Sequence, residues 1–307
     1  MRIGCHVSAL QNERKAPYDE AIENAGRLGF DGVELIAMDR GELTEYYTPD
    51  RVRGLRAAAA SNKVAISQFA IYSTACDGMA SLDPAEKSRD IALFRHGIDI
   101  CRELGCGIIN IVSHWPLGVK APLEYIPAYY YPIARGLGRA PSPKFKMTLP
   151  PDFDFAAIWR NYIDSLRIVS EAAADRGVKV SVEGHAHVIV SGVDAMLRMF
   201  DQVGNPALTI NFDAAWHLAL REYVPMSILK LRGHISHVHV RDGDGLLFYT
   251  APPGQGIIDW EGVFTALREI GYNGFLSFEW GGYDDYLDVA RDAKDYVSGI
   301  LRKLGIK

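Results

Sequence analysis

Apolar runs of strand length recur along the whole chain and alternate with stretches of helical periodicity. In the helical stretches apolar residues follow one another at spacings of three or four, as in Tyr18, Ile22 and Ala25. The strand-like runs cover eight segments: residues 2–7, 32–36, 64–70, 107–113, 178–183, 208–213, 235–240 and 274–279. Strands that alternate with helices form a parallel sheet with helices on its faces. Eight such units in 307 residues, with no break in composition, predict a single α/β domain over residues 1–307, folded as a (β/α)8 TIM barrel.

The second candidate fold is a doubly wound open sheet. Such a sheet, when it binds a nucleotide, carries a glycine-rich loop after its first strand. Residues 8–12 read Ser-Ala-Leu-Gln-Asn and contain no glycine. Side chains that cap helix N-termini stand at Thr48, Asp83, Asp154 and Asp259, between the strand-like runs. The barrel is therefore the fold that we expect.

Residues 115–152 form a long insert between the fourth strand and its helix. The connection is far longer than the roughly 2–6 residues usual for such a loop. It carries Trp115, Tyr125, three consecutive tyrosines at 129–131 and eight prolines. Aromatic side chains give flat contact area for a sugar or an aromatic aglycone, so we expect a lid that sets substrate size. Contact with a second subunit is the competing interpretation.

Metal-binding side chains end four consecutive strand-like runs, at Glu183, Asp213, His239 and Glu279. Each stands in the pattern polar, apolar, ligand, as in Ser-Val-Glu and Asn-Phe-Asp, and the third run reads His-Val-His-Val-Arg-Asp. The strand period of two places such polar side chains on one face. In a barrel, the functional groups gather at the C-terminal strand ends. Three carboxylates and one imidazole suit a divalent ion, with Mn first and Mg, Co or Zn as alternatives.

Most of the histidines also fall in or just after the strand-like runs. His237 is expected to be a packed, hydrogen-bonded core residue. The pocket is expected to be lined by side chains that could contact a substrate: His6, His114, Trp115, His217, Arg241 and Trp280.

The overall composition is that of an ordinary globular protein. Net charge is −5 and the isoelectric point is near 6.0, which argues against binding to nucleic acid or to anionic membranes. No run of 18 apolar residues and no N-terminal signal-like core is present, so we expect a cytoplasmic protein. The four cysteines form no CxxC pair and are expected to be reduced core residues.

The ordered ligand set resembles the xylose isomerase-like barrel superfamily of sugar phosphate isomerases and epimerases. The resemblance covers essentially the whole chain and rests on Val-Glu183, Phe-Asp213, the His-Val-His239 strand and Phe-Glu279-Trp. It implies that these four residues bind one divalent ion, commonly Mn or Mg. It also implies that Glu183 and Glu279 act as acid and base on either side of a sugar carbon. His185, two residues beyond Glu183 on the same strand face, is a further candidate base.

Two positions depart from that resemblance. Relatives often carry a His three residues after the Asp ligand, where this chain has Trp216, followed by His217. Epimerases of free ketoses often have a substrate-binding Arg six residues after the ligand His, where this chain has Gly245.

The expected activity is a metal-dependent isomerisation or epimerisation that begins with removal of a proton next to the carbonyl of a sugar or keto-sugar. Polarising that carbonyl stabilises the enediolate that results. A lyase begins with the same step, so an inosose or dehydroshikimate-type dehydratase, or a C-glycoside deglycosidase acting on a 3-keto glycoside, is the alternative. The endonuclease IV branch is less suited, because it uses three zinc ions and further histidines that residues 68–71 and 242–258 lack. A homo-oligomer or a small partner subunit is compatible with the insert.

Overall fold

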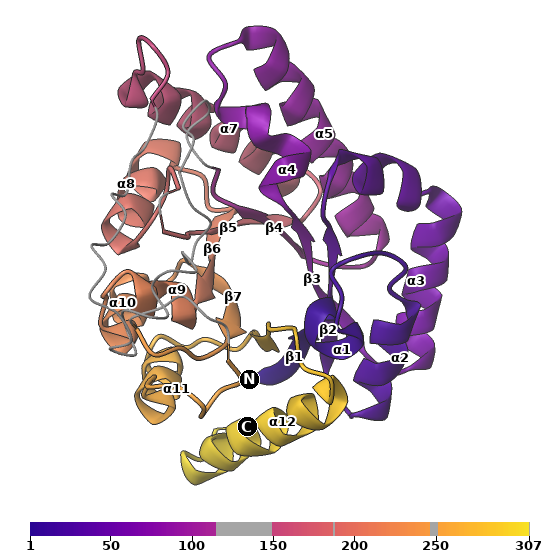
Figure 1. Cartoon of the computed structure of the whole chain (residues 1–307). Coiled ribbons are helices and arrows are strands. Elements are labelled where there is room, and N and C mark those ends of the chain that lie inside the picture. Colours follow the sequence, from indigo (N-terminus) through magenta and orange to yellow (C-terminus); the bar gives the residue numbers. More distant parts are fainter. Residues whose placement is uncertain (115–148, 187, 246–250, 307) are drawn as a thin grey trace, which may run out of the picture.

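The eight expected strands close into one parallel barrel, which confirms the predicted fold (Figure 1). The computed structural model describes residues 1–114, 149–186, 188–245 and 251–306. Consecutive strands pair in parallel around the barrel, and β8 pairs with β1 to close it. The strands are β1 (Arg2–His6), β2 (Gly32–Ala37), β3 (Ala65–Ile71), β4 (Ile108–Val112), β5 (Lys179–Glu183), β6 (Leu208–Asp213), β7 (Ile235–Val240) and β8 (Phe275–Phe278).

Helices surround this barrel and cover the outer face of the strands (Figure 1). They bury apolar side chains such as Phe94 of α5 and Leu166 of α7 against it. The helices are α1 (Val7–Gln11), α2 (Asp19–Arg27), α3 (Pro49–Ser61), α4 (Ser73–Cys76), α5 (Pro84–Glu103), α7 (Phe155–Ala174), α8 (Val193–Val203), α9 (Ala214–Ala219), α10 (Val224–Lys230), α11 (Trp260–Glu269) and α12 (Tyr286–Lys303), with short helical turns η1 (Glu42–Tyr46) and η2 (Asp77–Ala80). Among the described helices, none is long and apolar enough to cross a bilayer.

The capping residues expected from the sequence begin their helices. Thr48, Asp83, Asp154 and Asp259 each accept a hydrogen bond from a backbone N–H in the first turn of α3, α5, α7 and α11. These bonds satisfy N–H groups that have no partner inside the helix. They also fix where each strand-to-helix loop ends.

The long insert between β4 and α7 falls mostly outside the described residues. Residues 115–148 lie outside the described part of the chain, so the roles expected for Trp115 and for the insert at 115–152, as a lid or a subunit contact, stay predictions. All four cysteines are buried and unpaired, as expected.

Register across the barrel stacks the inward-facing side chains in layers. Asp213 of β6 is level with His239 of β7, and Asn211 is level with His237 one layer deeper. His239 is in turn level with Ser277 of β8, so Glu279 lies just beyond the end of that strand. Because barrel strands lie side by side, this stagger brings residues far apart in sequence to one point of the barrel axis.

Candidate active site

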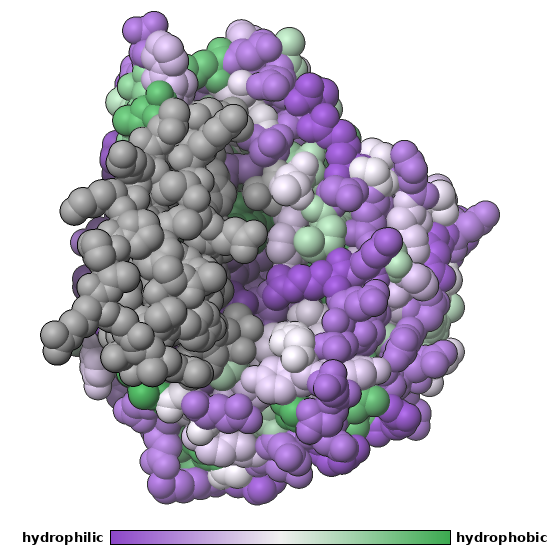
Figure 2. Space-filling view, in the orientation of Figure 1, coloured by the Kyte–Doolittle hydropathy of each residue, from purple (hydrophilic) through white to green (hydrophobic). Residues whose placement is uncertain are grey.

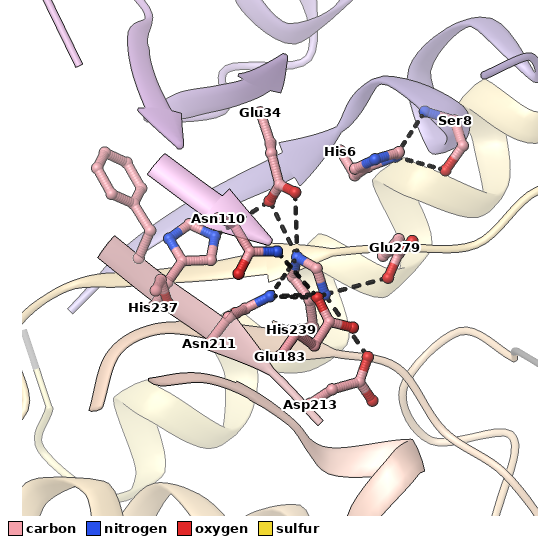
Figure 3. Close-up of polar contacts among 12 residues, drawn as sticks. His6, Ser8, Glu34, Asn110, Glu183, Asn211, Asp213, His237, His239 and Glu279 are labelled. Carbon is pink, nitrogen blue, oxygen red and sulfur yellow. Dashed lines mark hydrogen bonds and ion pairs between the residues drawn. The ribbon is translucent and has the colours of Figure 1, made fainter. Parts of the chain in front are cut away.

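Four buried side chains from consecutive strands converge at the C-terminal end of the barrel. Glu183 and Asp213 end β5 and β6, His239 lies in β7, and Glu279 follows β8. Each is at most 3% exposed. One ligand atom from each of the four lies within 4.8 Å of all the others. Figure 3 shows the carboxylates arranged about the His239 ring. The structure thus brings together the four residues that the sequence pattern selects.

The Nδ1 atom of His239 faces all three carboxylates. It lies 3.1 Å from Oε2 of Glu279 and 3.5 Å from both Oε2 of Glu183 and Oδ2 of Asp213. Three carboxylates this close together and shielded from water repel one another strongly unless a cation lies among them. Oxygen and imidazole donors are those that Mn²⁺, Mg²⁺ and Co²⁺ accept. The residues present therefore fit a divalent cation.

Two arginines supply positive charge at the edge of this cluster. Arg241 lies 2.5 Å from Asp213 Oδ2 through Nη2 and 2.9 Å from Glu279 Oε2 through Nη1. Arg14, in the loop after α1, lies 2.7 Å from the other Glu279 oxygen, Oε1. Arg14 also donates a short hydrogen bond to the Tyr72 hydroxyl. Both guanidiniums are thus bound to carboxylates of the site.

These charges control ionisation in the cluster. Burial alone would raise the pKa of Glu279, but Arg241, Arg14 and His239 together hold that pKa well below its ordinary value. Burial would likewise raise the pKa of Glu183, and His239 and His185 hold it well below. Both carboxylates are therefore ionised at neutral pH.

The pKa of His239 moves in the opposite direction. Burial would lower this pKa, but the carboxylates of Glu34, Glu183 and Glu279 raise it well above its ordinary value. A positive charge is therefore favoured at this point of the barrel, either as a proton on the ring or as a cation beside it.

Glu183 is held in place at both of its oxygens. The side-chain amides of Asn211 and Asn110 donate to Oε2 at 2.7 and 3.1 Å. The Nε2 atom of His185 lies 2.8 Å from Oε1. The His185 ring stacks on the indole of Trp216, with ring centroids 4.1 Å apart. The carboxylate therefore has a fixed orientation and a second titratable group directly beside it.

A cavity of about 280 Å³ opens over the cluster. Figure 2 shows a hollow near the centre of this face. The walls combine charged and apolar surface, and the side chains that line the cavity are Arg14, Glu34, Ala70, Ile71, Tyr72, Asn110, Val112, Glu183, His185, Trp216, His239, Arg241 and Glu279. The volume is close to the lower end of the range of roughly 300–1,000 Å³ for ligand pockets, which suits one small polar molecule.

Two of the histidines expected to line the pocket, His6 and His114, are buried, and the ring of His6 lies edge-on to that of His239, with ring centroids 6.4 Å apart. Nδ1 of His6 accepts the backbone N–H of Ser8 at 3.0 Å and begins α1 (Figure 3). His114 meets the Tyr162 ring edge-on, with ring centroids 5.1 Å apart. Burial lowers the pKa of each imidazole to about 4. They do not line the cavity among the described residues.

His217 and Trp280 are also turned into the protein. His217 stacks on Phe212, and its Nδ1 lies 2.5 Å from a carboxylate oxygen of Glu222. Trp280 is fully buried and stacks on Phe278. Trp216, the residue before His217, lines the cavity in its place.

Several residues of the site were not expected from the sequence. Glu34 and Asn110 lie inside β2 and β4, and each interrupts an apolar run with one polar residue, which is a readable signal. Trp216 stands out in the sequence only because it replaces the histidine usual in relatives. Arg14 and Tyr72 lie in a loop and at a strand end, where the sequence carries no such signal.

The loop after β7 is organised by the buried carboxylate of Asp242. This carboxylate accepts hydrogen bonds from the backbone N–H groups of Gly243, Gly254 and Ile258 and from the indole N–H of Trp260, at 2.8 to 3.1 Å. The Gly254-Gln255-Gly256 turn therefore directs the N–H of Gly254 at the protein's own side chain. Gly256 has to be glycine, because a Cβ there would lie 2.2 Å from Oδ1 of Asp242.

Comparison with known proteins identifies a family over most of the chain. Residues 22–301 match the sequence profile of the family described as xylose isomerase-like TIM barrel. The resemblance inferred from the strand-end motifs is thereby confirmed.

Individual relatives match over nearly their whole length. The L-ribulose-5-phosphate 3-epimerase UlaE of Escherichia coli strain K12 is 23% identical over 292 residues, which are 94% of this chain and 91% of that protein. The structure of D-psicose 3-epimerase from Clostridium cellulolyticum H10 with D-tagatose superposes with a TM-score of 0.75 at 19% identity, covering 98% of this chain and 99% of that chain. The 3-keto-D-glucoside 4-epimerase of E. coli gives a TM-score of 0.72 at 17% identity, covering 97% and 99%. These relatives are sugar epimerases, in agreement with the expected isomerase or epimerase class.

Proposed function

Because the chain belongs to the xylose isomerase-like TIM barrel family, we propose that it is a divalent-metal-dependent epimerase of keto-sugars. The observation that carries this proposal is the convergence of Glu183, Asp213, His239 and Glu279 beneath one cavity. Mn²⁺ is the ion we expect, because the donors are three carboxylate oxygens and one imidazole nitrogen. When bound, the ion would polarise a sugar carbonyl and so make the neighbouring C–H more acidic.

Glu183 and Glu279 are the carboxylates to which we assign the proton transfer. They come from β5 and from the end of β8, three strands apart in a closed eight-stranded barrel. A keto-sugar held between two carboxylates can lose its C–H proton to one of them, and the planar enediolate that results can take up, on the opposite face, a proton that the other carboxylate relays from a water molecule. That sequence inverts the carbon, whereas a single carboxylate would return the proton to the same face. Two carboxylates therefore support epimerisation.

His185 and Arg14 give Glu183 and Glu279 different capacities for proton transfer. His185 lies beside Glu183 Oε1 and can take up or return a proton there. Arg14, beside Glu279 Oε1, carries a permanent charge and cannot. We therefore assign Glu183, with His185, as the group that removes the substrate proton. Glu279 is then the carboxylate that we assign to the other side of the reacting carbon.

The residues around the cavity favour a substrate without a phosphate group. TIM barrels often bind phosphate with N–H groups of the loops after strands 7 and 8. Here N–H groups of the loop after β7 donate hydrogen bonds to the carboxylate of Asp242, and so are already bound within the protein. Within the described residues, the guanidiniums that line the cavity, Arg14 and Arg241, are bound to Asp213 and Glu279.

The substrate preference can be tested with paired substrates. We expect kcat/KM for a free ketose to exceed that for the matching 5-phosphate at least tenfold, with little inhibition by inorganic phosphate. A higher kcat/KM for the phosphorylated sugar would show that phosphate is recognised, and would reverse this part of the proposal.

The reaction itself can be followed by NMR in D2O. The Mn²⁺-loaded protein would be incubated with a panel of free ketoses and 3-keto glucosides, and quenched samples would be freed of metal before the spectra are recorded. Epimerisation predicts deuterium at the inverted carbon and a product of unchanged mass apart from that label. An eliminated fragment would favour the lyase alternative, and a panel without any exchange would contradict proton abstraction.

A further inference from the structure

We propose that Glu34 is a positioning residue that fixes the ring of His239, so that Nε2 carries the hydrogen and Nδ1 faces the carboxylate cluster. This inference rests on the proposed metal site for its consequence, but its structural core concerns two residues of the chain alone. Glu34 lies on β2, on the far side of the His239 ring from the cluster (Figure 3).

The geometry assigns opposite tasks to the two ring nitrogens. Nε2 of His239 lies 3.0 and 3.2 Å from the two oxygens of Glu34. Nδ1 of the same ring faces Glu279, at 3.1 Å. An ionised carboxylate can only accept, so the hydrogen shared with Glu34 belongs to Nε2. The lone pair that remains in the singly protonated ring is then at Nδ1, on the side of the cluster.

Glu34 is ionised, and its oxygens are engaged by the imidazole rings. The side chain is completely buried, which is costly for a carboxylate unless it is paired. Its hydrogen-bond partners among the described residues are the Nε2 atoms of His239 and His237, the latter at 3.2 Å. Burial would raise the pKa of Glu34, but His239 and His237 lower it below its ordinary value. Although Glu34 reaches the floor of the cavity, its oxygens are already turned to imidazoles.

A carboxylate behind a ligand histidine has a known physical effect. It holds the tautomer and ring orientation and makes the coordinating nitrogen a better donor, and its loss commonly costs about 10–100-fold in metal affinity. A purely structural role would be different: Glu34 would then fasten β2 to β7 without any effect on the Nδ1 side of the ring.

The experiment compares Glu34→Gln with His237→Gln. Both substitutions remove one side of the Glu34–His237 contact, but only the first removes a hydrogen-bond partner of His239 Nε2. Mn²⁺ affinity would be measured by titration calorimetry, with circular dichroism to verify the fold. We expect Glu34→Gln to bind Mn²⁺ at least tenfold more weakly, and His237→Gln to stay within about threefold of wild type. Equal affinity in Glu34→Gln and wild type would overturn the proposal.

Imidazole NMR of the protein without added metal gives a second readout that does not depend on metal binding. With ¹⁵N-labelled histidine, we expect a slowly exchanging Nε2–H signal for His239 that is lost or broadened in Glu34→Gln. The signal is assigned by its absence in His239→Gln. If Glu34→Gln fails to fold, Glu34→Asp keeps the charge at a longer distance, and its Nε2–H signal should be weakened. An unchanged signal in a folded Glu34 variant would refute the proposal.

The two readouts also separate this proposal from the proposed function. A wild-type protein that binds no divalent ion but loses the Nε2–H signal in Glu34→Gln would refute the metal-dependent function and support the role of Glu34. Two ions per chain, with one lost in His237→Gln, would show that Glu34, His237 and His239 are a metal site of their own, and would overturn the positioning role.

Discussion

Nε2 of His185 lies 2.8 Å from Oε1 of Glu183, whereas Oε2 of the same carboxylate is the oxygen that faces His239. Glu183 thus presents one oxygen to the ligand cluster and the other to a titratable ring. The ring itself is held flat against Trp216. A base that must both contact the ion and release a proton gains from such a division between its two oxygens.

Replacing His185 by Ala should therefore lower turnover by roughly 10²–10⁴-fold, the usual contribution of a positioned acid or base. Metal content should be retained, because His185 is not among the four converging ligands. Turnover and C–H exchange into D2O check the first expectation, and elemental analysis checks the second. Intact C–H exchange in the variant would show that His185 only orients Glu183 and takes no part in proton transfer.

Glu279→Gln should weaken divalent-metal binding at least 100-fold while the barrel stays folded, because one of three carboxylates is neutralised. Glu222→Gln is the matched control: this carboxylate also pairs with a histidine, His217, but lies outside the cluster. Elemental analysis should give one ion per wild-type chain. Three zinc ions per chain, or none after reconstitution, would contradict the expected site.

Metal affinity should rise with pH through the neutral range. The pKa of His239 is raised, so below that pKa an incoming ion has to displace a proton from the ring. Up to one proton is released, which corresponds to as much as a tenfold gain in affinity per pH unit. Calorimetry in buffers of different ionisation enthalpy counts the protons. A pH-independent affinity without proton release would contradict the raised pKa.

Stability of the protein without added metal should follow the reverse trend. A histidine with a folded-state pKa above its unfolded value of about 6.5 contributes stability that is fully present below pH 6.5. That contribution is lost as pH rises through the folded-state pKa of His239. Melting temperatures in EDTA should therefore decline above neutral pH, and should decline less in His239→Gln.

Asp242→Asn should destabilise the protein by about 1–3 kcal/mol, because an amide nitrogen would face N–H donors that now share a carboxylate. The loop after β7 depends on these bonds, so KM should rise as well. Asp259→Asn is the control, since Asn caps a helix nearly as well as Asp and residue 259 is exposed. Denaturant unfolding of both variants measures the difference.

The fold and the four ligand positions could be predicted because both depend on local pattern. Glu183, Asp213, His239 and Glu279 each follow an apolar run, and the barrel topology brings strand ends together whatever the loops do. The β6 and β7 strands have the bounds expected from the sequence, and the other strands differ by one residue at one or both ends.

The other contacts of the site depend on side-chain orientation and packing, which the pattern of apolar and polar residues does not determine. His217 follows Asp213 in the short helix α9, and the helical turn points its ring at Glu222 and leaves Trp216 at the cavity. Arg14 reaches Glu279 across 265 positions of sequence from an irregular loop. No periodicity or motif in the sequence predicts either contact.

The ligand set comes from four neighbouring strands, β5 to β8, and is dispersed over residues 183–279 when the chain is unfolded. An ion that binds only the closed barrel adds its binding free energy to folding, about 2.7 kcal/mol when its concentration is 100 times the dissociation constant. Half of the barrel wall would then be cross-linked through one atom. Under metal starvation the same chain would open more often, and proteases would degrade it faster, so its abundance in the cell would follow the metal supply.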